Sequence, residues 1–453
     1  MGYFLGIDLG ASSGRHIVGY DDLGVYKTVE VYRFENQFKN INGHLVWDLE
    51  YLFIEVIRGI RKAINEFGKI DSLSIDSWGC DYVLMNEDKV ILPCYAYRDN
   101  RTKNVIDEVL KLCPSDYLYQ RTGIQFQEFN TIFQLYDDLK TGRLDKATDF
   151  LMIPEYLIYK LTGKKVKEYT NATTTGLINL ETKEFDNKII SKLRFPKRLF
   201  PDITNGPSVV SDLTADIMKV VGLNIPVVLG PTHDTASAVE AIEETDVPYI
   251  SSGTWSLLGI RLPNGINTIE SMTSNWSNEG GIGYIRYQKN IMGLWIIQSL
   301  QKEIKTIYEK MIILAKTSNY QEIFDVNDSM FLAPTSMKEA ILKWFEDHHI
   351  QGPSSDADLV NCVFHSLAYS YKKAIEELEA NTRSKYQKIV IVGGGAKNKY
   401  LNELTEKYTG LEVIALPIEA SALGNLKVQE KVMKNYVPNE KQSKSIFKIF
   451  NKN

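Results

Sequence analysis

The sequence predicts an α/β protein with two β-sheet domains that face one cleft. Near the N-terminus an apolar run, residues 3–7, breaks into a small-residue turn, 10–14, and resumes as a second apolar run, 17–20. The same order of strand, Gly/Ser turn and strand returns at 249–259, in the second half of the chain. Two halves that open alike indicate duplicated sheet domains around a shared site.

The composition is that of an ordinary globular protein. The chain has 453 residues, 44% apolar and 24% charged, which is enough for two or three domains. A net charge of −5 argues against sequence-independent nucleic-acid binding, which needs a basic face. The four cysteines form no C-x-x-C pair, as expected in a reducing compartment. No signal-like or long apolar segment is present, so we expect a cytoplasmic protein with no membrane partner.

The order of elements supports a division of the chain into two domains. Strand-like runs at 26–34 and 72–76 flank a helix that Asp48 can cap. Residues 100–215 are more helical and irregular. The acidic, proline-ended segment 243–248 indicates a domain boundary, and we expect the hinge for cleft closure near residues 241–248. We therefore expect an N-terminal domain over 1–244 and a C-terminal domain over 245–453.

The first candidate site is the turn that follows the opening strand. Asp8 ends the strand, and the turn offers backbone N–H groups, the hydroxyls of Ser12 and Ser13, and the guanidinium of Arg15. Such a concavity suits phosphate oxygens, and Asp8 could hold the Mg²⁺ that accompanies a nucleotide. The chain has no P-loop motif, so ATP would have to bind in this other way. A plain hairpin with a capping aspartate is the alternative.

The second candidate site is Thr232-His233-Asp234-Thr235, which follows the buried strand 226–230. Carboxyl ends of strands are where α/β folds place their sites. Phosphoryl transfer needs an aligned hydroxyl and a base that takes its proton, and an aspartate can be that base. Alternatively, Asp234 only caps the helix from Ala236 to Ile242.

The second half repeats these features. Ser251 to Thr254 matches the first Gly/Ser turn, and Gly393 to Gly395 could let a flat adenine lie on the backbone. A plain hairpin and a tight turn are the alternatives. Asn290 is either a ligand residue or the N-cap of a helix over 291–298 that ends at Gln298.

A polar cluster follows the strand 72–76. Asp76, Trp78, Gly79 and Asp81 suit a polyol, because an indole packs on sugar C–H faces and carboxylates accept hydroxyl hydrogens. Further on, Arg98 and Asp99 lie in a polar turn, where they could be only a surface ion pair.

Taken together and in order, these motifs resemble those of the FGGY carbohydrate kinases. Two runs, RTGIQFQEFNT (121–131) and TNATTT (170–175), are typical of the members that act on L-rhamnulose. The other matching stretches cover both halves: DLGASSGR (8–15), SIDSWGCDYVL (74–84), YAYRDNRT (95–102), HDTASAV (233–239), YISSGTWSLLG (249–259), KNIMGLWIIQ (289–298), IVGGGAKN (391–398) and EASALGN (419–425).

The resemblance implies two actin-like (ribonuclease H-like) domains that flank an active-site cleft. It implies transfer of a phosphoryl group from ATP, with Mg²⁺, to O1 of L-rhamnulose in L-rhamnose breakdown. Asp234 is then the general base, and Asp8 the metal-holding residue. The implied nucleotide contacts are Ala11, Ser12, Ser13, Gly14, Arg15, Thr254, Gln298 and Gly395, and the implied sugar contacts are Gly79, His233, Asp234, Thr235 and Asn290.

Other functions stay open at this point. The same family pattern fits a kinase for L-fuculose, L-ribulose or glycerol. A nucleotide-switched module without catalysis would lack the sugar cluster, and a sugar-responsive repressor would need a DNA-binding motif before Tyr3. The expected partners are a small ketose and ATP, with the chain as a monomer or a small homo-oligomer.

Overall fold

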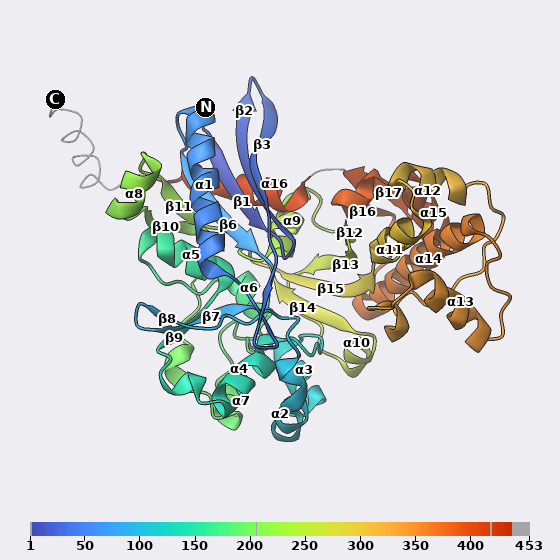
Figure 1. Ribbon diagram of the computed structural model, residues 1–453, viewed down its shortest axis with the longest axis horizontal. Coiled ribbons are helices and arrows are strands. Elements are labelled where there is room, and N and C mark those ends of the chain that lie inside the picture. The colour runs from blue at the N-terminus through green and yellow to red at the C-terminus, as the bar shows by residue number, and fades with distance from the viewer. Residues whose placement is uncertain (1, 205, 417–418, 437–453) are drawn as a thin grey trace.

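The computed structural model describes residues 2–204, 206–416 and 419–436. Figure 1 shows two lobes, each built on a six-stranded sheet, that meet along one side near α6, β14 and α10. The predicted α/β class with two sheet domains is confirmed.

The first sheet has the strand order β10-β11-β6-β1-β2-β3. Strand β1 pairs with antiparallel β2 and with parallel β6, so Asp8 lies opposite Asp76. Neighbours in a parallel pair project from the same face, and the two carboxylates are therefore close. The strands are β1 (Phe4–Leu9), β2 (Ser13–Asp22), β3 (Val25–Glu35), β6 (Ser72–Ser77), β10 (Ser208–Asp212) and β11 (Pro226–Leu229).

The second sheet repeats this pattern in the order β14-β15-β13-β12-β16-β17. Strand β12 pairs with antiparallel β13 and with parallel β16, as β1 does with β2 and β6. Each Gly/Ser turn therefore joins the first two strands of its own sheet. The strands are β12 (Tyr249–Ser252), β13 (Trp255–Leu262), β14 (Trp276–Gly280), β15 (Ile285–Met292), β16 (Lys388–Val392) and β17 (Glu412–Leu416).

Between β6 and β10 the first lobe carries a mostly helical insertion with its own core, centred on residues such as Phe133, Phe150 and Leu177. Within it β7 pairs with both β8 and β9. The elements are β7 (Tyr82–Asn86), β8 (Lys89–Ile91), β9 (Asp149–Met152), α2 (Ile106–Leu112), α3 (Ser115–Thr122), α4 (Thr131–Lys140), α5 (Ile153–Thr162), α6 (Tyr169–Thr173) and α7 (Asn187–Lys192).

The helix predicted to start at Asp48 forms as expected. The Asp48 side chain accepts a hydrogen bond from the Tyr51 backbone N–H, which satisfies one free donor of the first turn. Leu52, Val56 and Ile60 of this helix are buried in the core of the first sheet. The other elements of the first half are β4 (Lys39–Ile41), β5 (His44–Val46), α1 (Leu49–Phe67), α8 (Ala215–Val221) and α9 (Asp234–Glu240).

Helices of the second half pack around its sheet, with the 27-residue α14 at the centre of the core. They are α10 (Ile269–Thr273), α11 (Trp295–Ile304), α12 (Tyr308–Ala315), α13 (Met337–Asp347), α14 (Asp356–Thr382) and α15 (Lys399–Thr409). Among the helices of the described residues, none is long and apolar enough to cross a membrane.

Helix α16 (Ala420–Lys434) returns from the second half to the first sheet. Its Ala422 and Leu426 pack with Phe4 and Ile17. Its Gln429 Nε2 donates to the Leu5 carbonyl oxygen at 3.0 Å. The first sheet is therefore covered by a helix that the sequence places after the second.

Candidate active site

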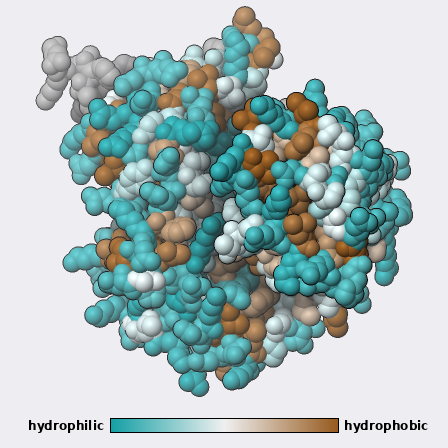
Figure 2. Space-filling model, turned by 45° about the vertical axis from the view of Figure 1, so that its right-hand side comes forward, coloured by the Kyte–Doolittle hydropathy of each residue, from teal (hydrophilic) through white to brown (hydrophobic). Residues whose placement is uncertain are grey.

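A cavity of about 560 Å³ lies between the lobes, and both halves of the chain line it. Figure 2 shows the surface hollowed between two lobes. Five residues expected at the site line this cavity: Gly79, His233, Thr235, Thr254 and Asn290. The structure thus brings the candidate sugar contacts, which come from three segments distant in sequence, together on the walls of one cavity.

Gly79 and His233 are neighbours because two segments run side by side. The Ser77 N–H at the end of β6 donates to the Thr232 carbonyl oxygen at 2.9 Å, and Ser77 forms a parallel bridge with His233. A Cβ on Gly79 would lie 2.8 Å from Thr174 Cγ2, so only glycine allows this close approach. The run at 170–175 therefore packs directly behind the sugar candidates.

Asp234 is the first residue of α9, directly after the extended residue His233. The N-cap position belongs to His233, so the alternative in which Asp234 caps this helix is wrong. Asp234 Oδ1 accepts hydrogen bonds from the Thr235 backbone N–H at 2.5 Å and from Thr235 Oγ1 at 3.1 Å. Its side chain is 30% exposed, which leaves the carboxylate open to a ligand.

Asp8 and Asp76 are buried carboxylates at the same end of the sheet. Burial raises the pKa of Asp8 to about 6; Arg15, at 2.8 Å, opposes this, and the charge of Asp234 adds to it. Burial, together with the charge of Asp8, also raises the pKa of Asp76 well above its usual value. Asp76 Oδ2 accepts from Asn425 Nδ2 at 2.6 Å, whereas Oδ1 is buried without a partner.

The first Gly/Ser turn is held by a residue that the sequence did not single out. Asn36 Nδ2 donates to the Gly10 carbonyl oxygen at 2.9 Å, and the Asn36 N–H donates to the Ser12 carbonyl oxygen at 3.0 Å. Ser12 stays exposed, with Ala11 and Ser13 partly so. Gly14 is buried, and Arg15 pairs with Asp8 and with Glu419.

The second turn gathers the other nucleotide candidates. The Trp295 N–H donates to the Thr254 carbonyl oxygen at 3.2 Å, so α11 begins against this turn, with Gln298 in the first turn of the helix. A Cβ on Gly395 would overlap Ser252 Oγ, which places the triple-glycine loop against the same turn. Thr254, Gln298 and Gly395 therefore surround one end of β12.

Asn290 does not cap a helix, in contrast to one of its two sequence interpretations. It lies within β15, opposite Leu257 of β13, and the pairing continues as far as Met292. Gly293 then packs against the Trp255 backbone, and α11 begins only at Trp295. The cavity-lining role of Asn290 is the interpretation that the geometry supports.

The interpretation of Arg98 and Asp99 as a surface ion pair is also wrong. Asp99 is buried and accepts from the Leu45 N–H at 2.7 Å and from the Arg101 N–H at 3.0 Å. Arg98 instead lines the cavity, with its Nε donating to Tyr97 Oη at 3.0 Å. Asp99 thus binds backbone N–H groups in the interior, whereas Arg98 lines the cavity.

Asp81 belongs to the predicted polyol cluster but does not line the cavity. It is fully buried, and its Oδ2 accepts from Trp47 Nε1 at 2.6 Å and from Trp78 Nε1 at 2.9 Å. The two indole rings lie 4.4 Å apart, and Trp78 lines the cavity. Asp81 therefore orients the cavity wall instead of binding a sugar.

Two further carboxylates were missed because their partners are distant in sequence. Glu168 Oε2 accepts from the Thr232 N–H at 3.0 Å and fixes the segment before Asp234. Glu279 lines the cavity from β14. Burial alone would raise the pKa of Glu279, but the charge of Arg286 holds it below its usual value, so Glu279 stays charged.

Solved structures share this architecture across nearly the whole chain. A ligand-bound xylulose kinase from Lactobacillus acidophilus superposes with a TM-score of 0.80, at 18% identity, over 99% of this chain and 96% of that one. A Plasmodium falciparum glycerol kinase with ADP gives a TM-score of 0.79, at 16% identity, over 97% and 91%. These similarities show the two-domain, actin-like fold.

The family models define the class of protein: an ATP-dependent carbohydrate kinase of two domains. The FGGY N-terminal domain model matches residues 3–240, and the FGGY C-terminal domain model matches residues 248–430. The chain belongs to the FGGY family of carbohydrate kinases.

Curated relatives in this family are rhamnulokinases. The protein from Oceanobacillus iheyensis is 41% identical over 452 residues, covering 98% of this chain and 96% of the relative. The rhamnulokinase from Bacillus subtilis is 37% identical over 434 residues, covering 94% and 89%.

Proposed function

We propose that this kinase transfers the γ-phosphoryl group of ATP to O1 of L-rhamnulose and releases ADP and L-rhamnulose 1-phosphate. The names of its relatives, at 41% and 37% identity over nearly the full chain, support this acceptor. The observation that carries the proposal is the position of Asp234, with an open carboxylate, between two residues that line the cavity, His233 and Thr235.

Asp234 is the general base in this proposal. Its Oδ1 is already occupied by the two donors of Thr235, while Oδ2 receives no hydrogen bond from the described residues. Oδ2 is therefore the oxygen that takes the proton of the sugar O1 hydroxyl as O1 bonds to phosphorus. Gly79, His233, Thr235 and Asn290 would hold the sugar on the walls of the cavity.

The nucleotide would be bound by both Gly/Ser turns. The first turn offers Ala11, Ser12 and Ser13 on its surface, followed by Gly14 and Arg15. The second places Thr254, Gln298 and Gly395 around the end of β12. Turns of this kind present N–H groups to phosphate oxygens without a P-loop.

We expect Mg²⁺ to bind beside Asp8, at the end of the first sheet where Asp8 and Asp76 lie opposite each other. In the described part of the chain, no three His, Cys, Asp or Glu side chains are arranged to hold a metal ion by themselves. Mg²⁺ with ATP is bound mainly by water and phosphates, and one carboxylate, Asp8, would complete its shell through water. The unpartnered Oδ1 of Asp76 supports this assignment, because beside the buried Asp8 it leaves a second carboxylate oxygen without a donor among the described residues. The ion supplies charge that neutralises the phosphates.

The acceptor profile tests the proposal. ADP release is measured with Mg·ATP and, in turn, L-rhamnulose, L-fuculose, L-ribulose, D-xylulose and glycerol, with an assay lacking any acceptor as the control. We expect kcat/KM to be highest for L-rhamnulose, and the phosphorus of the product to couple to the C1 protons by NMR. A higher kcat/KM for another acceptor would replace the substrate, and ADP release indifferent to every sugar would contradict sugar phosphorylation.

A further inference from the structure

A fully buried arginine reaches the sugar-binding histidine from the other half of the chain. Arg286, on β15, has its Nη2 3.1 Å from His233 Nδ1 and 3.1 Å from Glu279 Oε2. Its Nε donates to the Gly280 carbonyl oxygen at 2.8 Å, which fixes the plane of the guanidinium.

Donor counting fixes the direction of these hydrogen bonds. A guanidinium only donates, and Nη2 carries two hydrogens for the two acceptors around it. When Nη2 donates to both acceptors, the ring nitrogen opposite it accepts, and Nδ1 of His233 then carries no proton. A neutral imidazole with a bare Nδ1 carries its proton on Nε2.

His233 Nε2 lies 3.5 Å from Asp234 Oδ1. With the proton on Nε2, the polar N–H of His233 lies on the side of Oδ1, which accepts hydrogen bonds from the N–H and Oγ1 of Thr235. The two donors of Thr235 hold Oδ1, the nearby N–H of His233 adds a favourable charge contact, and Oδ2 is left without a donor among the described residues. The other tautomer would turn a lone pair toward Oδ1.

We propose that Arg286 is a positioning residue that holds His233 in the Nε2–H tautomer and thereby orients Asp234. The effect on catalysis rests on the proposed role of Asp234 as base, whereas the tautomer itself does not. Arg286 and Glu279 come from the second half of the chain, and His233 and Asp234 from the first. The second lobe therefore sets the state of a residue on the first.

Glu279 supplies the competing arrangement. Its Oε2 lies 3.3 Å from His233 Nδ1 and would accept a proton placed there. In the proposed arrangement Glu279 instead holds Arg286, and its negative charge balances the buried guanidinium. The two arrangements place the imidazole proton on different nitrogens and can be separated directly.

Imidazole ¹⁵N NMR on the ligand-free enzyme makes the first test. The chain has six histidines, and His233→Asn assigns the His233 signals by their loss. We expect the shift pattern of a ring protonated on Nε2 only. An Nδ1–H tautomer or an imidazolium in the wild-type enzyme would overturn the proposal.

The Arg286→Lys variant tests whether Arg286 is the residue that sets the tautomer of His233. Lysine keeps the charge but cannot reproduce the fixed fork of the guanidinium. We expect mixed tautomers of His233 and a fall in kcat of about tenfold, the scale of one lost hydrogen bond, with KM for the ketose changed less. Arg101→Lys is the matched control, because Arg101 is a buried, ion-paired arginine in the insertion, bonded to Asp138 at 2.9 Å.

The measurement of the His233 tautomer and the measurement of kcat can each contradict a different part of the proposal. An unchanged tautomer in Arg286→Lys would overturn the role of Arg286 whatever the acceptor is. A changed tautomer with unchanged kcat would confirm that Arg286 sets the ring but contradict its effect on the base. Equal tautomer shifts in Arg101→Lys would show a general loss of packing and overturn the specific role.

Discussion

The two oxygens of the Asp234 carboxylate have different surroundings. Oδ1 accepts from both donors of Thr235 and lies near His233, whereas Oδ2 receives no hydrogen bond from the described residues. A carboxylate with one oxygen held and one open keeps a fixed direction and still accepts a proton. The residues that create this asymmetry, 233–235, are consecutive, and the local motif was therefore enough to single out Asp234 as a candidate, although not to predict how its two oxygens differ.

Replacing the base tests this role. Asp234→Asn keeps the shape and the contacts of Oδ1 but removes the proton acceptor, so we expect kcat to fall by about 10² to 10⁴ and the affinity for the ketose to stay roughly the same. Steady-state kinetics and sugar binding by calorimetry measure the two quantities. Asp216→Asn, at a 91% exposed side chain, is the control. Nearly full kcat in Asp234→Asn would remove Asp234 from the role of base.

Asp81 illustrates how burial makes stability depend on pH. Burial raises its pKa to about 6 from 3.8, and the hydrogen bonds from Trp47 and Trp78 only partly offset this. A raised carboxyl pKa favours the protonated form in the folded state. The stabilisation that the raised pKa of Asp81 gives the folded state is complete below about pH 4 and is lost as the pH rises toward 6.

Asp81→Asn removes this titration. We expect the unfolding free energy of the wild type, relative to Asp81→Asn, to fall by ~3 kcal/mol between pH 3 and pH 7, from about two units of pKa. Urea unfolding at several pH values measures it, with Asp216→Asn as the exposed control. A difference that is constant over this pH range would contradict a raised pKa at Asp81.

At the scale of elements, local patterns predicted most strands and the capped helix α1, because alternation and three-four spacing report burial of one face. The sheet on which α16 packs could not be predicted from such local patterns. The apolar face of α16 could pack on either sheet. Tertiary contacts, such as the hydrogen bond from Asn425 to Asp76 at 2.6 Å, place it on the first sheet. Asn36, Glu168 and Arg286 were missed for the same reason, since each acts on a residue far away in sequence.

The contact between α16 and α9 depends on Gly424. A Cβ there would overlap the carbonyl oxygen of Ser237, in the first turns of α9 after Asp234. We expect Gly424→Ala to push the helices apart, lower stability by about 1–3 kcal/mol and lower kcat, because overpacking shifts backbone. Urea unfolding and kinetics check this, with Lys431→Ala on the exposed side of α16 as the control. Wild-type values for Gly424→Ala would contradict the close contact.

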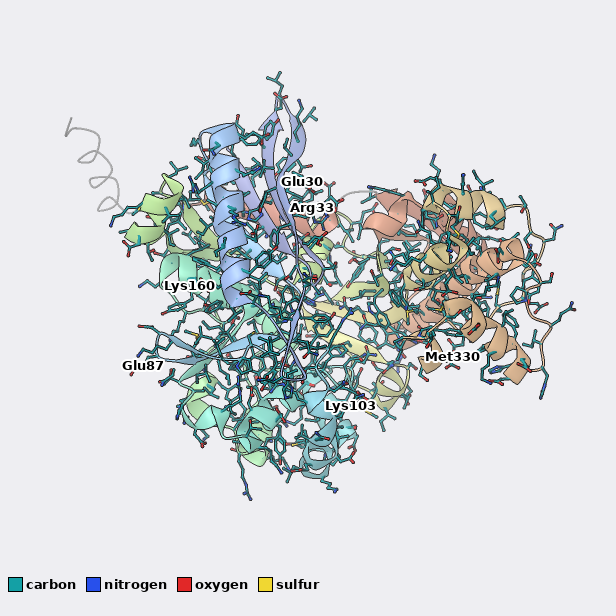
Figure 3. All side chains as sticks on the ribbon, in the orientation of Figure 1. Glu30, Arg33, Glu87, Lys103, Lys160 and Met330 are labelled. Carbon is teal, nitrogen blue, oxygen red and sulfur yellow. The ribbon has the colours of Figure 1, made fainter. Side chains whose placement is uncertain are left out.

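At the scale of the whole molecule, hydrogen bonds join the two lobes along the side formed by β14 and α3. There the Asn278 N–H donates to the Gly123 carbonyl oxygen at 2.8 Å, and Tyr119 Oη donates to the Trp276 carbonyl oxygen at 2.8 Å. In Figure 3, side chains crowd this region around β14 and α3. The cavity of about 560 Å³ is larger than a ketose needs, and we therefore expect the lobes to approach each other and exclude water during transfer.

Closure should therefore be a rotation about this contact side, with the segment 241–248 as the covalent hinge. Spin labels on introduced cysteines report it by pulsed electron resonance, because the four native cysteines are all buried. Leu23→Cys with Ile313→Cys, at 98% and 65% exposed positions, spans the open side between the β2–β3 tip and α12. Leu112→Cys with Ile269→Cys, on α2 and α10, spans the contact side and is the matched control.

Adding L-rhamnulose and a non-hydrolysable ATP analogue should shorten the distance between the labels at 23 and 313. The distance between the labels at 112 and 269 should stay the same, because the hydrogen bonds of Asn278 with Gly123 and of Tyr119 with Trp276 join the two lobes on this side. Shortening of both distances would indicate compaction of the whole molecule instead of rotation. Identical distances with and without ligands would contradict closure, and water would then have to be excluded by the sugar and nucleotide alone.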